Sequence, residues 1–153
     1  MTRRFSLLAP LALMACASSA AAATLEVVKT PSCGCCSVWV ERMKAAGFTV
    51  KVRDVEDTSP IAKAAGVPDR MRSCHTAKIG GYVIEGHVPA ADIRRLLAQK
   101  PKAVGLSVPG MPAGSPGMEM GGRVDRYQTV LIQADGKHKV WATHGGSADA
   151  HVH

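Results

Sequence analysis

The order in which strand-like and helix-like segments alternate limits the folds open to this chain. Residues 25–29 (LEVVK) form a short β-branched run, and residues 48–55 (FTVKVRDV) alternate apolar with polar side chains, as a half-buried strand does. Two further strand-like runs, residues 76–79 and 82–84, flank a Gly-Gly dipeptide that permits a tight hairpin turn. Helix-like segments follow the first run, the second run and the hairpin.

The three helix-like segments carry helix-end signals. An apolar repeat at helical spacing ends at Gly47, a residue typical of a helix C-terminus. Ser59 and Pro60 supply an N-cap and a first-turn proline for a second, short helix, and Pro89 opens the third. The resulting order, β-α-β-α-β-β-α, predicts an α/β domain of the thioredoxin-like class, a small mixed sheet flanked by helices. We expect parallel pairing in its first half and antiparallel pairing in its second.

The C-terminal third extends this domain. Residues 108–122 (VPGMPAGSPGMEMGG) are rich in proline, glycine and methionine, which predicts an irregular, exposed loop. Two strand-like runs on either side of Asp135-Gly136 predict a C-terminal β-hairpin that extends the sheet. We therefore expect a single domain over residues 24–144, followed by a disordered tail at residues 145–153.

The first 23 residues have the pattern of a secretory leader. Arg3 and Arg4 precede a short apolar run, and a small-residue segment follows it, which predicts a cleavable signal peptide over residues 1–23. Lipoprotein cleavage at Cys16 is the weaker alternative, because the residues before it fit that motif poorly. A membrane span needs roughly 20 apolar residues, and no segment reaches that length. We expect the mature protein to be soluble and exported.

Composition argues against nucleic-acid binding and against two separate cores. The chain has 153 residues, of which 46% are hydrophobic and 20% charged, enough for one modest core. Signal cleavage lowers the formal net charge from +7 to +5, and the longest basic run left is the pair Arg94-Arg95. Such a charge without a basic cluster does not favour a nucleic-acid partner.

Three cysteines in the stretch SCGCCSVW are the strongest chemical signal. Cys33 and Cys36 form a C-x-x-C pair at a helix N-terminus, where the backbone N–H groups stabilise a thiolate, as in thioredoxin-like oxidoreductases. Cys35 between them offers a dithiol catalyst a competing disulfide partner, but it offers a soft metal such as Cu(I) one more ligand. Cys74, just before the third strand, occupies the place where thioredoxin-like enzymes carry a cis-proline.

We interpret these four cysteines as a Cu(I) site of Cys33, Cys35, Cys36 and Cys74. Two alternatives stay open. The pair Cys33 and Cys36 can act as a catalytic dithiol, or the four cysteines can form two ordinary disulfides, such as Cys33–Cys36 and Cys35–Cys74. A structural zinc site is less favoured, because three thiols from one short loop give an awkward tetrahedron.

Further sulfur and nitrogen donors lie near these cysteines or in the long loop. Met111, Met118 and Met120 crowd a segment without an amphipathic face, and thioethers bind Cu(I) without deprotonation. His75 adjoins Cys74, and His87 is a weaker case of the same kind. We expect His75 and the three methionines to be secondary metal ligands.

Three segments carry a family resemblance: TPSCGCCSVWVERMKAAGF, SCHTAKIGGYVIEGHVPAADIRRLL and VGLSVPGMPAGSPGMEM. They resemble the CopG-like family of exported proteins, long catalogued as being of unknown function and often encoded beside copper-resistance determinants. The resemblance covers residues 25–143. It implies a thioredoxin-like fold, a periplasmic location and copper bound by Cys33, Cys35, Cys36 and Cys74, with the Met118/Met120 loop nearby. It leaves open whether the family also interconverts Cu(I) and Cu(II).

Together these observations predict a periplasmic copper-binding protein of copper resistance and homeostasis that coordinates Cu(I) through four cysteine thiolates. The alternative is a thiol–disulfide or Cu(I)/Cu(II) oxidoreductase that uses the Cys33/Cys36 pair. The expected partners are copper ions and other periplasmic copper-handling proteins, with no nucleic acid and no membrane span.

Overall fold

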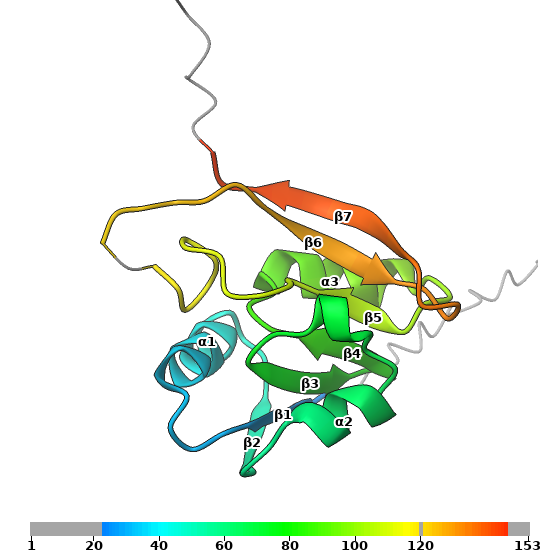
Figure 1. Cartoon of the computed structure of the whole chain (residues 1–153), viewed down its shortest axis with the longest axis horizontal. Helices are drawn as coiled ribbons and strands as arrows, with labels where there is room; N and C mark the ends of the chain where they lie inside the picture. Colours follow the sequence, from blue (N-terminus) through cyan, green and yellow to red (C-terminus); the bar gives the residue numbers. More distant parts are fainter. Residues whose placement is uncertain (1–22, 120, 147–153) are drawn as a thin grey trace, which may run out of the picture.

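The computed structural model describes residues 23–119 and 121–146, which form a mixed α/β fold around one sheet (Figure 1). The strands are β1 (Leu25–Lys29), β2 (Val50–Asp54), β3 (His75–Ile79), β4 (Tyr82–Glu85), β5 (Gly105–Ser107), β6 (Tyr127–Ile132) and β7 (His138–His144). The helices are α1 (Gly34–Ala45), α2 (Ser59–Ala64) and α3 (Ala90–Gln99), with a short 3-10 helix, η1, at Asp69–Met71. The predicted signal peptide, apart from Ala23, and most of the predicted tail lie outside the described residues.

Within the described residues the sheet has seven strands in the order β2-β1-β3-β4-β5-β6-β7. β1 pairs in parallel with β2, and β3 runs antiparallel to both β1 and β4. This arrangement confirms the predicted pairing and is consistent with a thioredoxin-like core, in which helices connect or follow these four strands. β6 and β7 form the predicted C-terminal hairpin, with Asp135 and Gly136 in its turn.

One strand was not expected from the sequence. β5 has only three residues, too few to show any hydrophobic period, yet it joins β4 to the C-terminal hairpin. It lies so close to β4 that a side chain at Gly105 would collide with the Val83 carbonyl. The predicted cap of α2 is also wrong: Thr58 is the N-cap, and the Ser59 N–H donates to the Asp57 carboxylate at 2.8 Å.

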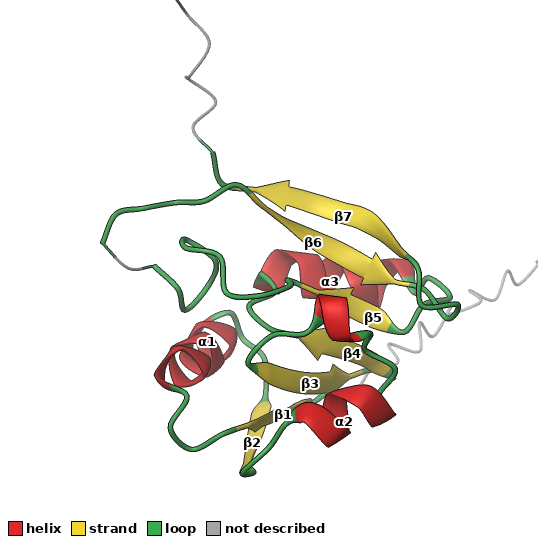
Figure 2. Cartoon of the chain, in the orientation of Figure 1, coloured by secondary structure: helices red, strands yellow, loops and turns green. Residues whose placement is uncertain are grey.

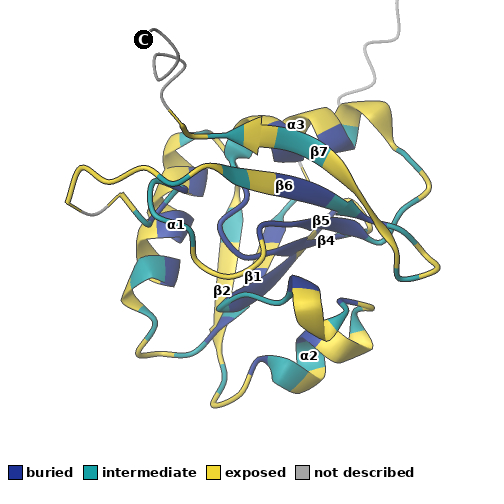
Figure 3. Ribbon diagram, turned by 45° about the horizontal axis from the view of Figure 1, so that its top comes forward, coloured by how far each residue is buried: buried dark blue, intermediate teal, exposed yellow. Residues whose placement is uncertain are grey.

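The two faces of the sheet are covered by different helices (Figure 2). α1 and α3 pack on one face through Trp39, Met43 and Leu96, whereas α2 and η1 contribute Ala62 and Met71 to a smaller core on the other. Figure 3 shows the central strands buried and the outer surfaces of the helices exposed. Among the described residues, no helix combines the length and the apolar character that crossing a membrane requires.

Candidate metal centre

The loop between β1 and α1 places three sulfurs at the start of the helix. Cys33 is the N-cap of α1, and its N–H donates to the Thr30 carbonyl at 3.1 Å. Cys33 and Cys36 form a disulfide with their Cα atoms 5.3 Å apart, while Cys35 and Cys74 are free thiols. The structure thus differs from the predicted four-thiolate state, because two of the four sulfurs are bonded to each other.

Cys74 reaches this loop from the start of β3. β3 lies beside β1, with His75 opposite Lys29 in register, so the residue before His75 faces the loop that follows β1. All four cysteine sulfurs lie within 4.8 Å of one another, and the Sγ atoms of Cys33 and Cys35 are 3.6 Å apart. Reduction of the disulfide by two electrons and two protons would turn this cluster into four thiols, a donor set that suits a soft metal ion.

The Cys74 thiol is held in its protonated form by its surroundings. Burial raises its pKa to about 12, and the nearby Cys35 adds to the shift. A metal ion that binds this sulfur must therefore displace a proton, so metal affinity should rise with pH.

Two histidines complete a second donor group around the same sulfur. The Cys74 Sγ lies 3.0 Å from His87 Nε2 and 3.5 Å from His75 Nδ1. His87 Nδ1 is 2.8 Å from the Pro116 carbonyl, which can only accept, so we assign the ring hydrogen to Nδ1. The lone pair of His87 Nε2 then faces Cys74, whose S–H donates to it.

His75 is a buried, neutral imidazole. Its ring packs against Trp39, with centroids 4.4 Å apart, and meets the His87 ring edge-on at 5.2 Å. Burial lowers the pKa of His75 to about 3, and the neighbouring His87 adds to the shift. His75 Nε2 is buried and has no hydrogen-bond partner among the described residues. A neutral imidazole is the form of histidine that binds metals.

A buried carboxylate fixes the backbone that carries Cys74. Glu85 on β4 accepts the Ser73 N–H at 2.8 Å with one oxygen and the Thr76 hydroxyl at 2.7 Å with the other. Burial raises the pKa of Glu85. These side-chain hydrogen bonds and the pairing of β3 with β1 hold the segment that carries Cys74.

The segment over residues 108–122 is an irregular loop, as predicted, but part of it is buried. Gly117 lies against the first turn of α1, where a side chain would come within 2.8 Å of the Cys35 carbonyl oxygen. Glu119 forms an ion pair with Arg42 of α1 at 3.3 Å. The loop, drawn in yellow in Figure 1, therefore packs along α1, from the first turn that carries Cys35 to Arg42 in the last turn.

The three loop methionines are not equivalent. Met111 is 53% exposed and Met118 is half-buried. Met120 lies outside the described residues. The structure brings His75 to the cysteines, and the copper role of the methionines stays a prediction.

Sequence reasoning ranked His87 below His75 as a candidate ligand, although a stronger signal for it was present. In a two-stranded hairpin centred on Gly80-Gly81, residue 74 falls opposite residue 87. The observed register pairs Thr76 with Glu85, and just beyond this pair the Gly86 N–H donates to the His75 carbonyl at 2.9 Å. The hairpin register was therefore the feature that could have joined His87 to Cys74.

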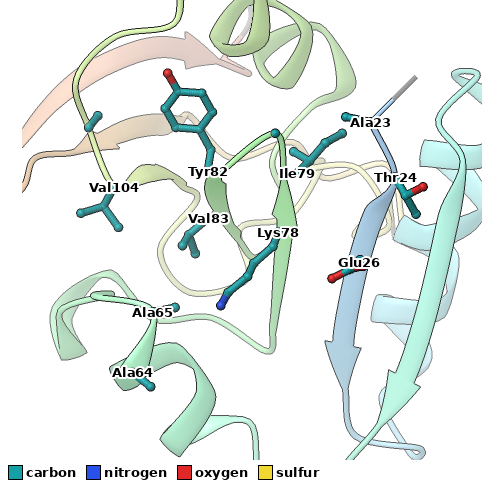
Figure 4. Close-up of a pocket in the computed structure, with 13 residues that line it drawn as sticks. Ala23, Thr24, Glu26, Ala64, Ala65, Lys78, Ile79, Tyr82, Val83 and Val104 are labelled. Atoms are coloured by element: carbon teal, nitrogen blue, oxygen red, sulfur yellow. The ribbon is translucent and has the colours of Figure 1, made fainter. Parts of the chain in front are cut away.

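A hollow of about 740 Å³ lies elsewhere on the molecule (Figure 4). It is lined by the turn between β3 and β4 and by Ala64, Ala65 and Val104. Because β3 starts at the cysteines and ends at this turn, the hollow belongs to the far end of the strand. None of the cysteines or histidines within residues 23–119 and 121–146 lines it.

The fold and the cysteine cluster together define a small mixed α/β protein with a candidate soft-metal site at a helix N-terminus. Comparison with known proteins gives its family. Two solved structures titled copper resistance protein CopG, forms 2 and 1, are 44% and 46% identical to the chain, with TM-scores of 0.77 and 0.76. Both matches cover 80% of this chain and 98% of the other. The chain belongs to the CopG family.

Two other comparisons complete this result. Residues 71–118 match a family described as a protein of unknown function, DUF411. No curated protein matches the chain.

Proposed function

We propose that this protein binds Cu(I) for copper resistance and homeostasis, using the thiolates of Cys33, Cys35, Cys36 and Cys74. One observation carries the proposal: sulfurs from two separate segments lie within 4.8 Å of one another. Thiolates are the ligands that Cu(I) prefers, and the backbone N–H groups at the start of α1 stabilise their negative charge.

The surroundings of the cluster suit a protein that holds a metal ion rather than one that releases it freely. The loop segment at Gly117 covers the first turn of α1, and the Glu85 clamp fixes the segment of Cys74. Supported ligands of this kind lose less conformational freedom on binding than free side chains do. The two CopG structures are titled copper resistance proteins, which supports extending that role to this chain.

The same proposal includes the cell compartment and partners. A signal peptide over residues 1–23 would deliver a single domain, residues 24–144, to the periplasm. There the protein would take copper from, or pass it to, other periplasmic copper-handling proteins. The methionines of the loop, of which Met111 is more exposed than Met118, would serve as secondary ligands during that transfer.

One observation favours a second candidate, a thiol–disulfide or Cu(I)/Cu(II) oxidoreductase. Cys33 and Cys36 form a disulfide at the N-terminus of α1, the arrangement of a dithiol catalyst. Cys35 lies 3.6 Å from Cys33 and competes for the same partner, which weakens a simple two-cysteine cycle.

A Cu(I) titration tests the leading proposal. The reduced mature protein is titrated anaerobically against a competing Cu(I) chelator, together with Cys35→Ser, Cys74→Ser and the matched control Ser32→Ala, an exposed residue of the same loop. We expect each cysteine variant to lose at least tenfold in affinity and the control to match the wild type. Wild-type protein that cannot compete for copper would end the proposal.

An insulin-reduction assay tests the second candidate on the same proteins. Turnover that Cys33→Ser abolishes and Ser32→Ala leaves intact would support an oxidoreductase. Absence of turnover in the wild type, with Cu(I) binding intact, would leave metal binding as the function.

A further inference from the structure

Cys74 belongs to two donor groups that overlap at its sulfur. The first contains the four cysteines, and the second contains Cys74, His75 and His87. The disulfide between Cys33 and Cys36 removes two ligands from the first group and none from the second.

We propose that the disulfide form of the protein keeps a separate site, Cys74, His75 and His87, for a divalent ion of borderline softness such as Zn(II) or Cu(II). The Cys33–Cys36 disulfide then acts as a switch between this site and the Cu(I) site. The switch rests on the proposed function, whereas the three-ligand site in the oxidised protein stands on its own geometry.

The two sulfur–nitrogen distances are close to those of a tetrahedral metal site, and all three donor atoms lie within 4.8 Å of one another. Metal–sulfur and metal–nitrogen bonds of about 2.3 and 2.0–2.1 Å place a sulfur and a nitrogen ligand about 3.5 Å apart. The Cys74 sulfur is 3.5 Å from His75 Nδ1 and 3.0 Å from His87 Nε2. One pair already has this separation, and the other needs to widen by only about 0.5 Å.

Both histidines are supported as metal ligands. The Pro116 carbonyl accepts from His87 Nδ1, which orients the ring and leaves the Nε2 lone pair facing Cys74. His75 is fully buried, and its Nδ1 atom already lies 3.5 Å from the Cys74 sulfur. Its ring packs against Trp39 and His87, with centroids 4.4 and 5.2 Å away, which orients the imidazole toward the site.

The chemistry of the two groups separates their metals. Four thiolates favour a soft, monovalent ion, while one thiolate and two imidazoles suit Zn(II) or Cu(II). A dithiol reductant converts the disulfide form of the protein to the reduced form. It gives two electrons and two protons to the Cys33–Cys36 disulfide, which becomes two thiols, and the reductant itself becomes a disulfide. Binding of the divalent ion releases the proton of the Cys74 thiol.

Cobalt(II) is the probe for this site, because cobalt–thiolate bonds give an intense near-ultraviolet band and tetrahedral cobalt gives strong visible bands. Mature protein with the disulfide verified by mass spectrometry is titrated anaerobically with Co(II), and Zn(II) is then added to displace it. We expect one equivalent of Co(II) with both sets of bands. Cys74→Ser should abolish the thiolate band, and Cys35→Ser should retain it.

His87→Gln, with the exposed His138→Gln as its matched control, tests the nitrogen ligand. We expect His87→Gln to weaken Co(II) binding by 10- to 100-fold and by much more than it weakens Cu(I) binding to the reduced protein. Circular dichroism establishes that each variant is folded. If His87→Gln does not fold, the near-isosteric Cys74→Ser variant still tests the site.

Two results would overturn the inference: oxidised wild type that binds no Co(II), or a thiolate band that survives Cys74→Ser and disappears in Cys35→Ser. If the oxidised protein binds no Co(II) while the reduced protein binds Cu(I), this inference alone fails. If the reduced protein binds no Cu(I) while the Co(II) bands appear, the proposed function fails and the three-ligand site stands.

Discussion

The buried carboxylate of Glu85 is expected to determine both the stability of the domain and the position of Cys74. Glu85 is 1% exposed, and its carboxylate accepts hydrogen bonds from the Ser73 N–H and the Thr76 hydroxyl. We compare Glu85→Ala, which removes both acceptors, with Glu85→Gln, which keeps an acceptor for Ser73 and a polar group that the Thr76 hydroxyl can pair with by rotating.

The size of the effect follows from the unpaired donors. Each donor left without an acceptor in a buried site costs about 1–3 kcal/mol, so losing the acceptors of both donors in Glu85→Ala should lower the free energy of unfolding by about 2–6 kcal/mol. The effect of Glu85→Gln depends on pH. Burial raises the pKa of Glu85 in the folded state above its usual 4.5, so the folded protein binds that proton more tightly than the unfolded chain.

Stability contributed by this carboxyl is therefore present below the unfolded pKa and is lost as pH rises through the folded pKa. A neutral amide avoids that loss, so Glu85→Gln should be at least as stable as the wild type at pH 7.5 and should lose this advantage at pH 4. Urea unfolding of the metal-free, disulfide-intact proteins at both pH values measures the free energies of unfolding of the wild type and the two variants. In parallel, iodoacetamide labelling of Cys74 should accelerate in Glu85→Ala and stay near the wild-type rate in Glu85→Gln.

Equal destabilisation by Glu85→Ala and Glu85→Gln would refute the hydrogen-bond argument. A Glu85→Ala variant within 0.5 kcal/mol of the wild type, a difference about the size of an ordinary surface substitution, would refute it as well.

Two further predictions concern the loop and the C-terminal hairpin. Gly117 has a φ of +88° and lies against the Cys35 carbonyl, so Gly117→Ala should push the loop from α1 and speed iodoacetamide labelling of Cys35 several-fold; an unchanged rate would contradict this packing. The buried carboxylate of Asp92 on α3 lies 2.7 Å from His144 Nε2 at the end of β7. Asp92→Ala should lower the free energy of unfolding by about 1–3 kcal/mol and speed amide exchange near His144. Glu41→Ala, which removes an exposed ion pair with Lys44 at 2.9 Å, should change the free energy of unfolding by under about 0.5 kcal/mol, and equal losses from both variants would disprove a specific role for Asp92.

Much of the fold could be predicted from the sequence because its signals are local. β1 follows from a short run of apolar, β-branched residues, and the hairpin of β3 and β4 follows from two strand-like runs around a Gly-Gly turn, signals that act over a few positions. β5 could not be predicted, because its three residues become a strand only when β4 and β6 supply hydrogen-bonding partners on both sides. The loop at residues 108–122 has no regular pattern, so its packing against α1 depends on contacts between residues distant in sequence.

For the candidate site, the sequence by itself determined the four cysteines, their placement at a helix N-terminus and just before a strand, and the family resemblance that the comparisons confirmed. It could not determine which sulfurs are bonded to each other, because three thiols in four positions permit several pairings. Only the tertiary structure shows that Cys33 is bonded to Cys36 and that His87 Nε2 lies 3.0 Å from the Cys74 sulfur. It also shows that the Pro116 carbonyl orients that histidine. The physical reason is that donor distances and lone-pair directions depend on strand register and loop packing, which form only when the whole sheet is assembled.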